Sequence, residues 1–443
     1  MTISDEWTLE DYIGHAPHIS SLGEMVKECT PPYVIGIHGD WGSGKTSFLR
    51  KLHLYLSGKK CGYKGAENAT GILWSNNYHP ATNIEAIWFD AWRYQFEPTP
   101  AVALLNEIRS HFTLYKKFVG ESAKLTYSAL MSIDELTKKI GISPEKIINA
   151  GEKWEKDYLS RPLPSQLCKD LLEQAIKDLL GRGKNRRLVI FVDDLDRCVG
   201  KVAFRLLEAM KIYFSITNCV FILGMDVRHV KGAVACELKE TGSVPGMKDG
   251  SEELYAGDYL NKIFQHVFYL PYTASYKKYL GKLFKTQEKD LNQEYIDKII
   301  EYDLLPRNPR KVKTFINGLQ FYLKQLKEKS PKEAIVPEYA LIFAYLKYMS
   351  HDIYRILESD MDFWNPLVSF CQNGRAEDIE VFKPYKLREK VTQIETENME
   401  FQYESAFLDP GDESVFHVAG LIRNYNNGIR PTDDELNRYL LRV

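Results

Sequence analysis

A glycine-rich segment has the residue types and spacing that bind phosphate. Gly39-Asp40-Trp41-Gly42-Ser43-Gly44-Lys45-Thr46 fits the pattern G-x-x-x-x-G-K-[ST]. Glycines let backbone N–H groups curl around phosphate oxygens without Cβ clashes, and a helix that begins here points its positive end at the same anion. Lys45 is expected to reach the β- and γ-phosphates, and Thr46 to bind Mg²⁺ through its hydroxyl. We place the adjacent Ser47 in the same nucleotide-binding set.

Two carboxylates follow a buried apolar run later in the chain. Leu188-Val189-Ile190-Phe191-Val192 ends in Asp193-Asp194, which is the form of a Walker B element. Asp193 is expected to hold Mg²⁺, directly or through water. Asp194 is the candidate that orients or deprotonates an attacking water. The alternative is that Asp193, Asp194 and Asp196 only cap the next helix, because Asp is a favoured N-cap residue. Because the chain also contains a phosphate-binding loop, the metal-binding interpretation of these carboxylates is preferred.

These segments require elements that hold them at one edge of a sheet. Continuous apolar runs are typical of parallel strands that are covered on both faces. Strands are predicted at 33–38, 84–90, 188–193 and 218–226. Helices are predicted at 47–56 (ending at Gly58), 101–118, 166–180 and 201–213. Residues 57–83 are expected to be irregular, and residues 237–256 to form a mobile loop.

The distribution of strand signals predicts two parts. Residues 1–272 are expected to form an α/β core around a parallel sheet, with a polar helical insertion at about 116–165. Strand signals stop beyond about residue 273, so residues 273–443 are predicted to be an all-α lid and C-terminal region.

Composition narrows the class of protein. The 58 Lys and Arg residues nearly balance the 60 Asp and Glu residues, so the net charge of −2 does not point to nucleic acid. No run of 18 apolar residues suggests a membrane helix, and the acidic N-terminus lacks the apolar core of a signal peptide. Seven scattered cysteines without a C-x-x-C pair are typical of reduced thiols. A cytoplasmic location without membrane contact is therefore expected.

Several motifs together resemble the KAP family of P-loop NTPases. The phosphate-binding loop, including its Trp, resembles the family's G-x-W-G-x-G-K-[ST] loop, and Asp193-Asp194-Leu195-Asp196-Arg197 matches its D-D-L-D-R signature. Further segments resemble the family in the same order: Trp88-Phe89-Asp90-Ala91-Trp92-Arg93-Tyr94, Phe221-Ile222-Leu223-Gly224-Met225-Asp226, Tyr259-Leu260-Asn261-Lys262-Ile263-Phe264-Gln265 and Asn308-Pro309-Arg310-Lys311. Asp90 stands where Asn is usual, and Asn261 replaces an acid. The resemblance spans about residues 20–320.

The resemblance implies a P-loop NTPase fold of the α/β class that binds ATP and Mg²⁺ and hydrolyses ATP. It also implies a helical region that closes over the nucleotide. Many members carry transmembrane helices between the two Walker motifs, whereas the insertion here is polar, so this chain resembles a soluble branch. Soluble bacterial relatives are often linked to defence against phage, which is an association and not a derivation from these residues. No N-K-x-D guanine motif lies in the right place, which agrees with ATP.

Four cations are candidates for sensing the γ-phosphate: Arg197, Lys262, Arg307 and Arg310. A cation that reaches developing phosphoryl charge accelerates transfer about 10³–10⁵-fold. Asp226 would lie near the same phosphate. The alternative is ordinary ion pairing, such as Arg197 with Asp194 or Asp196.

Asp90, at the end of a predicted strand, has two interpretations. It is either a partner of the metal-bound or attacking water, or part of an aromatic core with a paired Asp and Arg.

Three functions remain open on the sequence alone. The first is an Mg²⁺-dependent ATPase whose hydrolysis drives a conformational or assembly cycle. The second is a nucleotide-gated homo-oligomeric switch or scaffold with little turnover until an effector protein arrives. The third is a nucleic-acid-stimulated motor, for which the basic run Arg307, Arg310, Lys311 and Lys313 is weak support, because a solvated helix face explains it better.

Overall fold

The chain divides into two compact units. The computed structural model describes residues 5–64, 80–96, 185–241, 251–271, 308–373 and 431–441, together with isolated positions within 66–74, 103–108, 173–180 and 279–299. One unit comprises Trp7–Pro271, and the other combines Met1–Glu6 with Tyr272–Val443. The insertion predicted at about 116–165 lies outside the described residues.

The first unit is built on a five-stranded parallel sheet. The strands are β1 (Tyr33–His38), β2 (Ile84–Asp90), β3 (Arg187–Asp193), β4 (Cys219–Met225) and β5 (His266–Tyr269). Their order across the sheet is β2-β3-β4-β1-β5, and every neighbouring pair is parallel. All carboxyl ends therefore meet at one edge, and β4 separates the strand that leads into the phosphate-binding loop from the strand that ends in Asp193.

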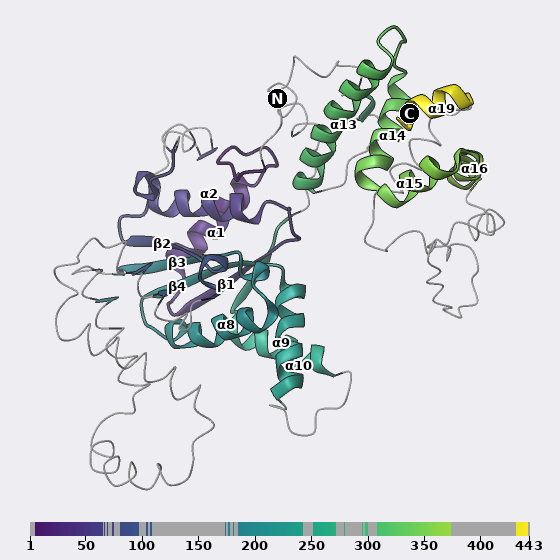
Figure 1. The fold of residues 1–443 in the computed structure, drawn as a ribbon. Coiled ribbons are helices and arrows are strands. Elements are labelled where there is room, and N and C mark those ends of the chain that lie inside the picture. The colour runs from purple at the N-terminus through teal and green to yellow at the C-terminus, as the bar shows by residue number, and fades with distance from the viewer. Residues whose placement is uncertain are drawn as a thin grey trace, which may run out of the picture. The chain divides into compact units, whose positions relative to one another are not determined.

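Helices cover both faces of this sheet (Figure 1). The helices are α1 (Ala16–Glu28), α2 (Lys45–Ser57), α8 (Gly200–Phe214), α9 (Val227–Thr241) and α10 (Glu252–Ile263). In β3, Val189 and Phe191 pack with α1 and α2, whereas Leu188, Ile190 and Val192 pack in the core beneath α8, α9 and α10. Both faces are apolar, so every residue of β3 and β4 is buried. The predicted α/β fold with a parallel sheet core is confirmed.

Two helical glycines differ in what surrounds them. A Cβ on Gly23 of α1 would lie 2.2 Å from Cδ1 of Tyr55 on α2, whereas a Cβ on Gly232 of α9 would meet no atom within 4 Å. We expect Gly23→Ala to lower the free energy of unfolding by about 1–3 kcal/mol through overpacking. Gly232→Ala should raise it by about 0.5–1 kcal/mol, because alanine loses less backbone entropy in a helix. Chemical denaturation followed by circular dichroism measures both, and equal effects would contradict the close packing of α1 on α2.

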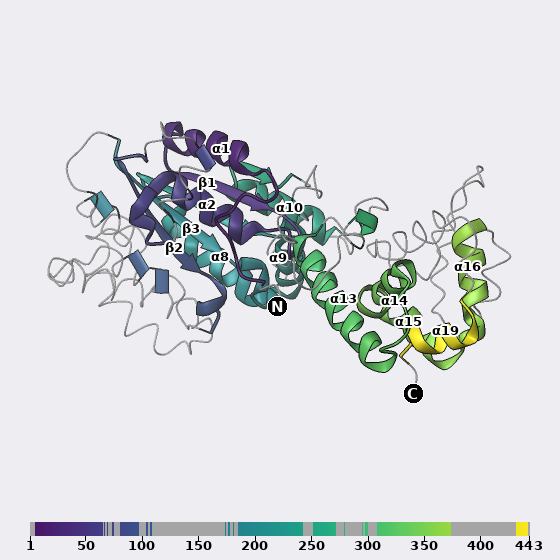
Figure 2. The ribbon, with the colours of Figure 1, turned by 90° about the horizontal axis from the view of Figure 1, so that it is seen from above.

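The described part of the second unit is helical. It contains α13 (Pro309–Lys329), α14 (Pro337–Met349), α15 (His351–Ser359), α16 (Trp364–Asn373) and α19 (Asp433–Tyr439) (Figure 2). Buried aromatic rings join these helices, because Phe343 stacks on both Trp364 and Tyr439. The hydroxyls of Tyr322 and Tyr354 donate to the carbonyls of Tyr439 and Leu440, so backbone groups at the end of α19 have buried partners.

Short 3₁₀ turns connect several elements. They are Gly58–Cys61, Trp92–Tyr94, Leu195–Arg197 (η3) and Met361–Phe363. Among the described residues, no helix combines the length and apolar character needed to cross a bilayer.

Two local predictions need correction. The loop expected at 237–256 is wrong at both ends, because α9 continues to Thr241 and α10 begins at Glu252. Residues 242–250 lie outside the described part. Strand β5 was not predicted, because this four-residue edge strand has no buried side chain to produce a strand pattern.

Candidate functional site

The phosphate-binding loop joins β1 to α2 and depends on its glycines. Gly42 has φ +85° and Gly44 has φ +97°, backbone conformations that L side chains rarely adopt. Gly39 is packed closely, since a Cβ there would lie 2.6 Å from the Ser43 hydroxyl oxygen and 2.8 Å from Leu270. Gly44 is the N-cap residue of α2 and offers no side-chain cap. The first amides of α2 are therefore left for an external acceptor.

Hydroxyl groups of the loop have different partners. The Ser43 hydroxyl oxygen is buried without a hydrogen-bond partner, although a buried polar atom normally has one. The Ser47 hydroxyl accepts the Thr8 amide at 3.1 Å, so the segment before α1 lies against the start of α2. Of these two hydroxyls, Ser43 is the one available to a ligand, and Ser47 already supports the fold.

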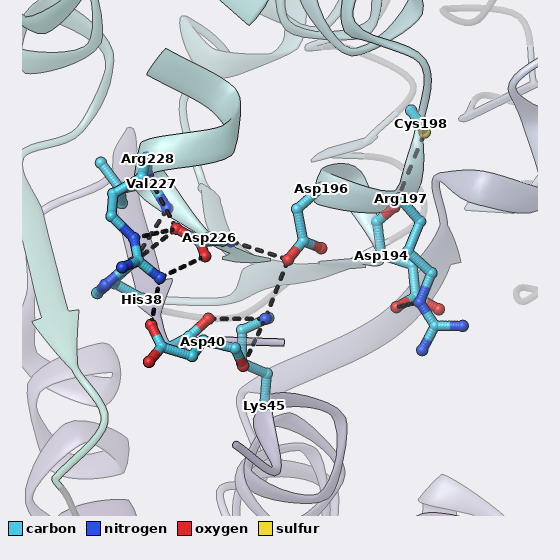
Figure 3. Close-up of polar contacts among 11 residues, drawn as sticks. His38, Asp40, Lys45, Asp194, Asp196, Arg197, Cys198, Asp226, Val227 and Arg228 are labelled. Carbon is cyan, nitrogen blue, oxygen red and sulfur yellow. Dashed lines mark hydrogen bonds and ion pairs between the residues drawn. The ribbon is translucent and has the colours of Figure 1, made fainter. Parts of the chain in front are cut away.

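Lys45 is directed toward the acidic turn after β3 (Figure 3). Its ammonium nitrogen lies 3.0 Å from Oδ2 of Asp196 and donates to the carbonyls of Gly39 at 2.7 Å and Asp40 at 3.3 Å. The side chains of Lys45 and Asp196 are only 9% and 8% exposed, so this ion pair is nearly removed from solvent. The predicted loop lysine thus contacts the predicted acidic element directly.

Asp193 and Thr46 form the candidate metal site. Oδ1 of Asp193 is buried without a hydrogen-bond partner, and the nearby Thr46 hydroxyl favours the charged form of this carboxylate and so acts to lower its pKa. Burial, followed by the neighbouring charge of Asp194, raises the pKa of Asp193 to about 7. A hard cation that takes oxygen ligands would satisfy the free oxygen and favour the charged form. The residues present therefore fit Mg²⁺.

Asp194 leaves the strand in an unusual backbone conformation. Its φ is +60° and its ψ is 28°, the left-handed region that Asp and Asn tolerate better than other side chains. Its carboxylate lies 2.7 Å from Nε of Arg197. Burial raises the pKa of Asp194, and the Arg197 charge opposes this rise. Arg197 thus forms the ion pair that was the alternative on the sequence, and its contact with the γ-phosphate stays a prediction.

The end of β4 adds charged groups beside the loop. Arg228, at the start of α9, lies 2.5 Å from Oδ1 of Asp40 and 3.0 Å from Oδ2 of Asp226. Burial raises the pKa of Asp226, but its hydrogen bonds to Arg228 outweigh burial, so the pKa of Asp226 is lowered.

Nδ1 of His38 accepts the Val227 amide at 3.0 Å, and burial lowers the pKa of His38. The imidazole is therefore neutral, and it ties the end of β1 to the start of α9.

Asp90 lies at the same edge, at the end of β2. It pairs in register with Asp193, and its carboxylate accepts the Arg93 amide at 3.2 Å. The Phe89 and Tyr94 rings stack on each other nearby. The aromatic packing expected if Asp90 belongs to the core is therefore present. Asp90 also lies beside Asp193, which is the position that a water-orienting role requires.

One other predicted cation lies elsewhere in the first unit. Lys262 is exposed near the end of α10, just before β5, and Gln265 hydrogen-bonds the Val34 backbone at the beginning of β1. Residues 34–38 advance about 13 Å along the strand, so Lys262 lies toward the amino-terminal edge of the sheet, opposite the loop. The sheet does not bring it together with Lys45.

Arg310 belongs to the second unit. It is the second residue of α13, whose N-cap Asn308 accepts the Arg310 amide, and its Nε lies 2.6 Å from Asp5. Arg307 lies outside the described residues.

Sequence reasoning missed Asp196 as the partner of Lys45 and Arg228 as the cation that contacts the loop. The signal for Asp196 was its place two residues after Asp194, which also suited a capping role. The signal for Arg228 was its place two residues after a strand that ends in Asp226. Neither signal predicts a contact with the loop unless it is known that β4 lies beside β1 in the sheet.

Comparison with protein families agrees with this geometry. The sequence profile described as KAP family P-loop domain matches residues 15–325. The matched range contains the whole parallel sheet, the loop and the acidic turn, and it extends into α13. No curated protein matches the chain.

Proposed function

Because the chain belongs to the KAP family of P-loop domains, we propose that it binds ATP with Mg²⁺ and hydrolyses it. The observation that carries the proposal is the direct contact between the loop and the acidic end of β3. Lys45 pairs with Asp196, and the Thr46 hydroxyl interacts with the Asp193 carboxylate. These contacts support a phosphate cradle beside a hard-cation site, the arrangement that phosphoryl transfer requires.

Binding would use groups that the fold presents together. The first amides of α2, the Ser43 hydroxyl and the Lys45 ammonium are the donors for phosphate oxygens. Thr46 and Asp193 would hold Mg²⁺, which when bound neutralises charge on the β- and γ-phosphates. The Trp41 side chain is 67% exposed beside the cradle.

Hydrolysis would depend on positioning and electrostatics. Asp194 is the candidate that orients the attacking water and accepts its proton, because it follows Asp193 at the same strand end. Its ion pair with Arg197 restrains the direction of the carboxylate. Within the first unit, Arg197 stays a candidate for contacting the γ-phosphate, and Arg228 joins it because it contacts the loop through Asp40.

We further propose that turnover drives a conformational or assembly cycle with a homo-oligomer as its product. The resemblance to P-loop NTPases supports this step, since γ-phosphate contacts commonly order mobile segments in such proteins. An effector protein and a role in defence against phage remain proposals that rest on the family alone.

The test is nucleotide binding and turnover by the purified full chain. Isothermal titration with ATP in Mg²⁺ should show saturable binding, with GTP weaker, and phosphate release should stop when EDTA removes Mg²⁺. Light scattering with and without MgATP measures assembly in the same samples. Titrations without heat or saturation for either nucleotide would overturn the proposed function.

A further inference from the structure

Oxygen atoms of the protein already surround the ammonium group of Lys45. A lysine ammonium carries three N–H groups. In this structure three oxygens surround it, namely the carbonyls of Gly39 and Asp40 and Oδ2 of Asp196. A phosphate oxygen can therefore accept a hydrogen bond from Lys45 only if it displaces one of these oxygens or shares an N–H group with it.

Asp196 is the partner best able to give way. The two carbonyls belong to the loop itself, and that of Asp40 also accepts the Ser43 amide at 3.0 Å, which closes the turn. Asp196 lies on η3 and holds the ammonium through a side chain. Oδ2 of Asp196 also accepts the Asp226 amide at 3.0 Å, so the carboxylate keeps a partly buried hydrogen bond after Lys45 leaves.

Charge favours the same exchange. Asp196 and a triphosphate are both anions that compete for one nearly buried cation, and like charges repel strongly where water is largely excluded. We propose that Asp196 is a positioning residue that holds Lys45 in the nucleotide-free protein and is replaced by phosphate on binding. Asp196 thereby acts as an internal competitor that sets nucleotide affinity. This inference rests on the proposed function, because it concerns the same site.

The exchange has a consequence at the end of β4. When Asp196 releases Lys45, its remaining contact is the amide of Asp226, whose carboxylate binds Arg228. Arg228 in turn pairs with Asp40 of the loop. A chain of contacts therefore connects Asp196 to the loop through the end of β4.

The test compares Asp196→Asn with a matched variant in the full chain. Asparagine keeps an oxygen that accepts the Asp226 amide but removes the charge that holds Lys45. Titration of a fluorescent ATP analogue with MgCl₂ should show affinity about tenfold tighter than wild type, the size expected when a hydrogen bond to a charged group no longer opposes binding. Without nucleotide, the same variant should melt at a lower temperature. Asp11→Asn removes the carboxylate that pairs with Lys51, a buried lysine of α2, and should leave the affinity near the wild-type value.

The outcomes separate the inference from the function on which it rests. Unchanged or weaker binding by Asp196→Asn overturns the exchange, as does equal tightening by Asp11→Asn, which would indicate general repulsion. If the wild-type chain binds no ATP analogue, the proposed function fails and the inference falls with it. Asp196→Ser, which also accepts the Asp226 amide without charge, replaces the asparagine variant if that variant does not fold. Non-additive melting temperatures of Lys45→Met, Asp196→Asn and the double variant, measured without nucleotide, independently check the ion pair.

Discussion

Lys45→Met is expected to lower the maximal rate of ATP hydrolysis by about 10²–10³-fold, the loss that follows removal of one well-placed donor to developing negative charge. Methionine retains much of the length and apolar stem of lysine but has no ammonium group. Phosphate release at saturating ATP measures this loss. Binding should weaken as well, because the same ammonium would contact the phosphates before reaction.

The variant should also affect the nucleotide-free protein. Asp196 is 8% exposed, and without Lys45 its charge loses its cation, so the melting temperature should fall. Lys239→Met is a suitable control, because Lys239 is an exposed residue of α9 whose partner is Glu252. It should keep wild-type turnover. Equal turnover in both variants would exclude the loop as the phosphate site.

Asp194→Asn is expected to reduce hydrolysis by about 10²–10⁴-fold while nucleotide affinity changes only a few-fold. An amide cannot accept the proton of the attacking water, but it is close in size to the carboxylate. The substitution suits this position because φ is +60° there, a conformation that asparagine adopts as readily as aspartate. The loss can thus be assigned to the carboxylate and not to the backbone.

Single-turnover phosphate release together with calorimetric titration separates the two effects. Asp194→Ala gives a useful comparison, since alanine also adds backbone strain at this position and should lower stability further. Arg197→Gln frees the Asp194 carboxylate from its ion pair. If Asp194→Asn hydrolyses ATP at the wild-type rate, another group must orient the water, and Asp90 at the end of β2 is the next candidate.

Local patterns in the sequence determined the parts of the site that depend on neighbouring residues. The glycine spacing of residues 39–46 predicted the loop, and the apolar run before Asp193 predicted the strand that ends in acid; β1, β2, β3 and β4 lie within a residue of their predicted bounds. Such features are readable because turns and buried parallel strands place requirements on adjacent positions. The family resemblance is confirmed by the match over residues 15–325.

The tertiary structure alone decided which of these residues meet. The position of β4 between β3 and β1 brings Arg228 to Asp40 across 188 positions of sequence. The turn at η3 brings the Asp196 carboxylate to the Lys45 ammonium group. Because β5 runs parallel to β1, Lys262, which precedes β5, lies at the opposite edge of the sheet. Strand order and side-chain pairing depend on burial between distant segments, which leaves little trace in local periodicity.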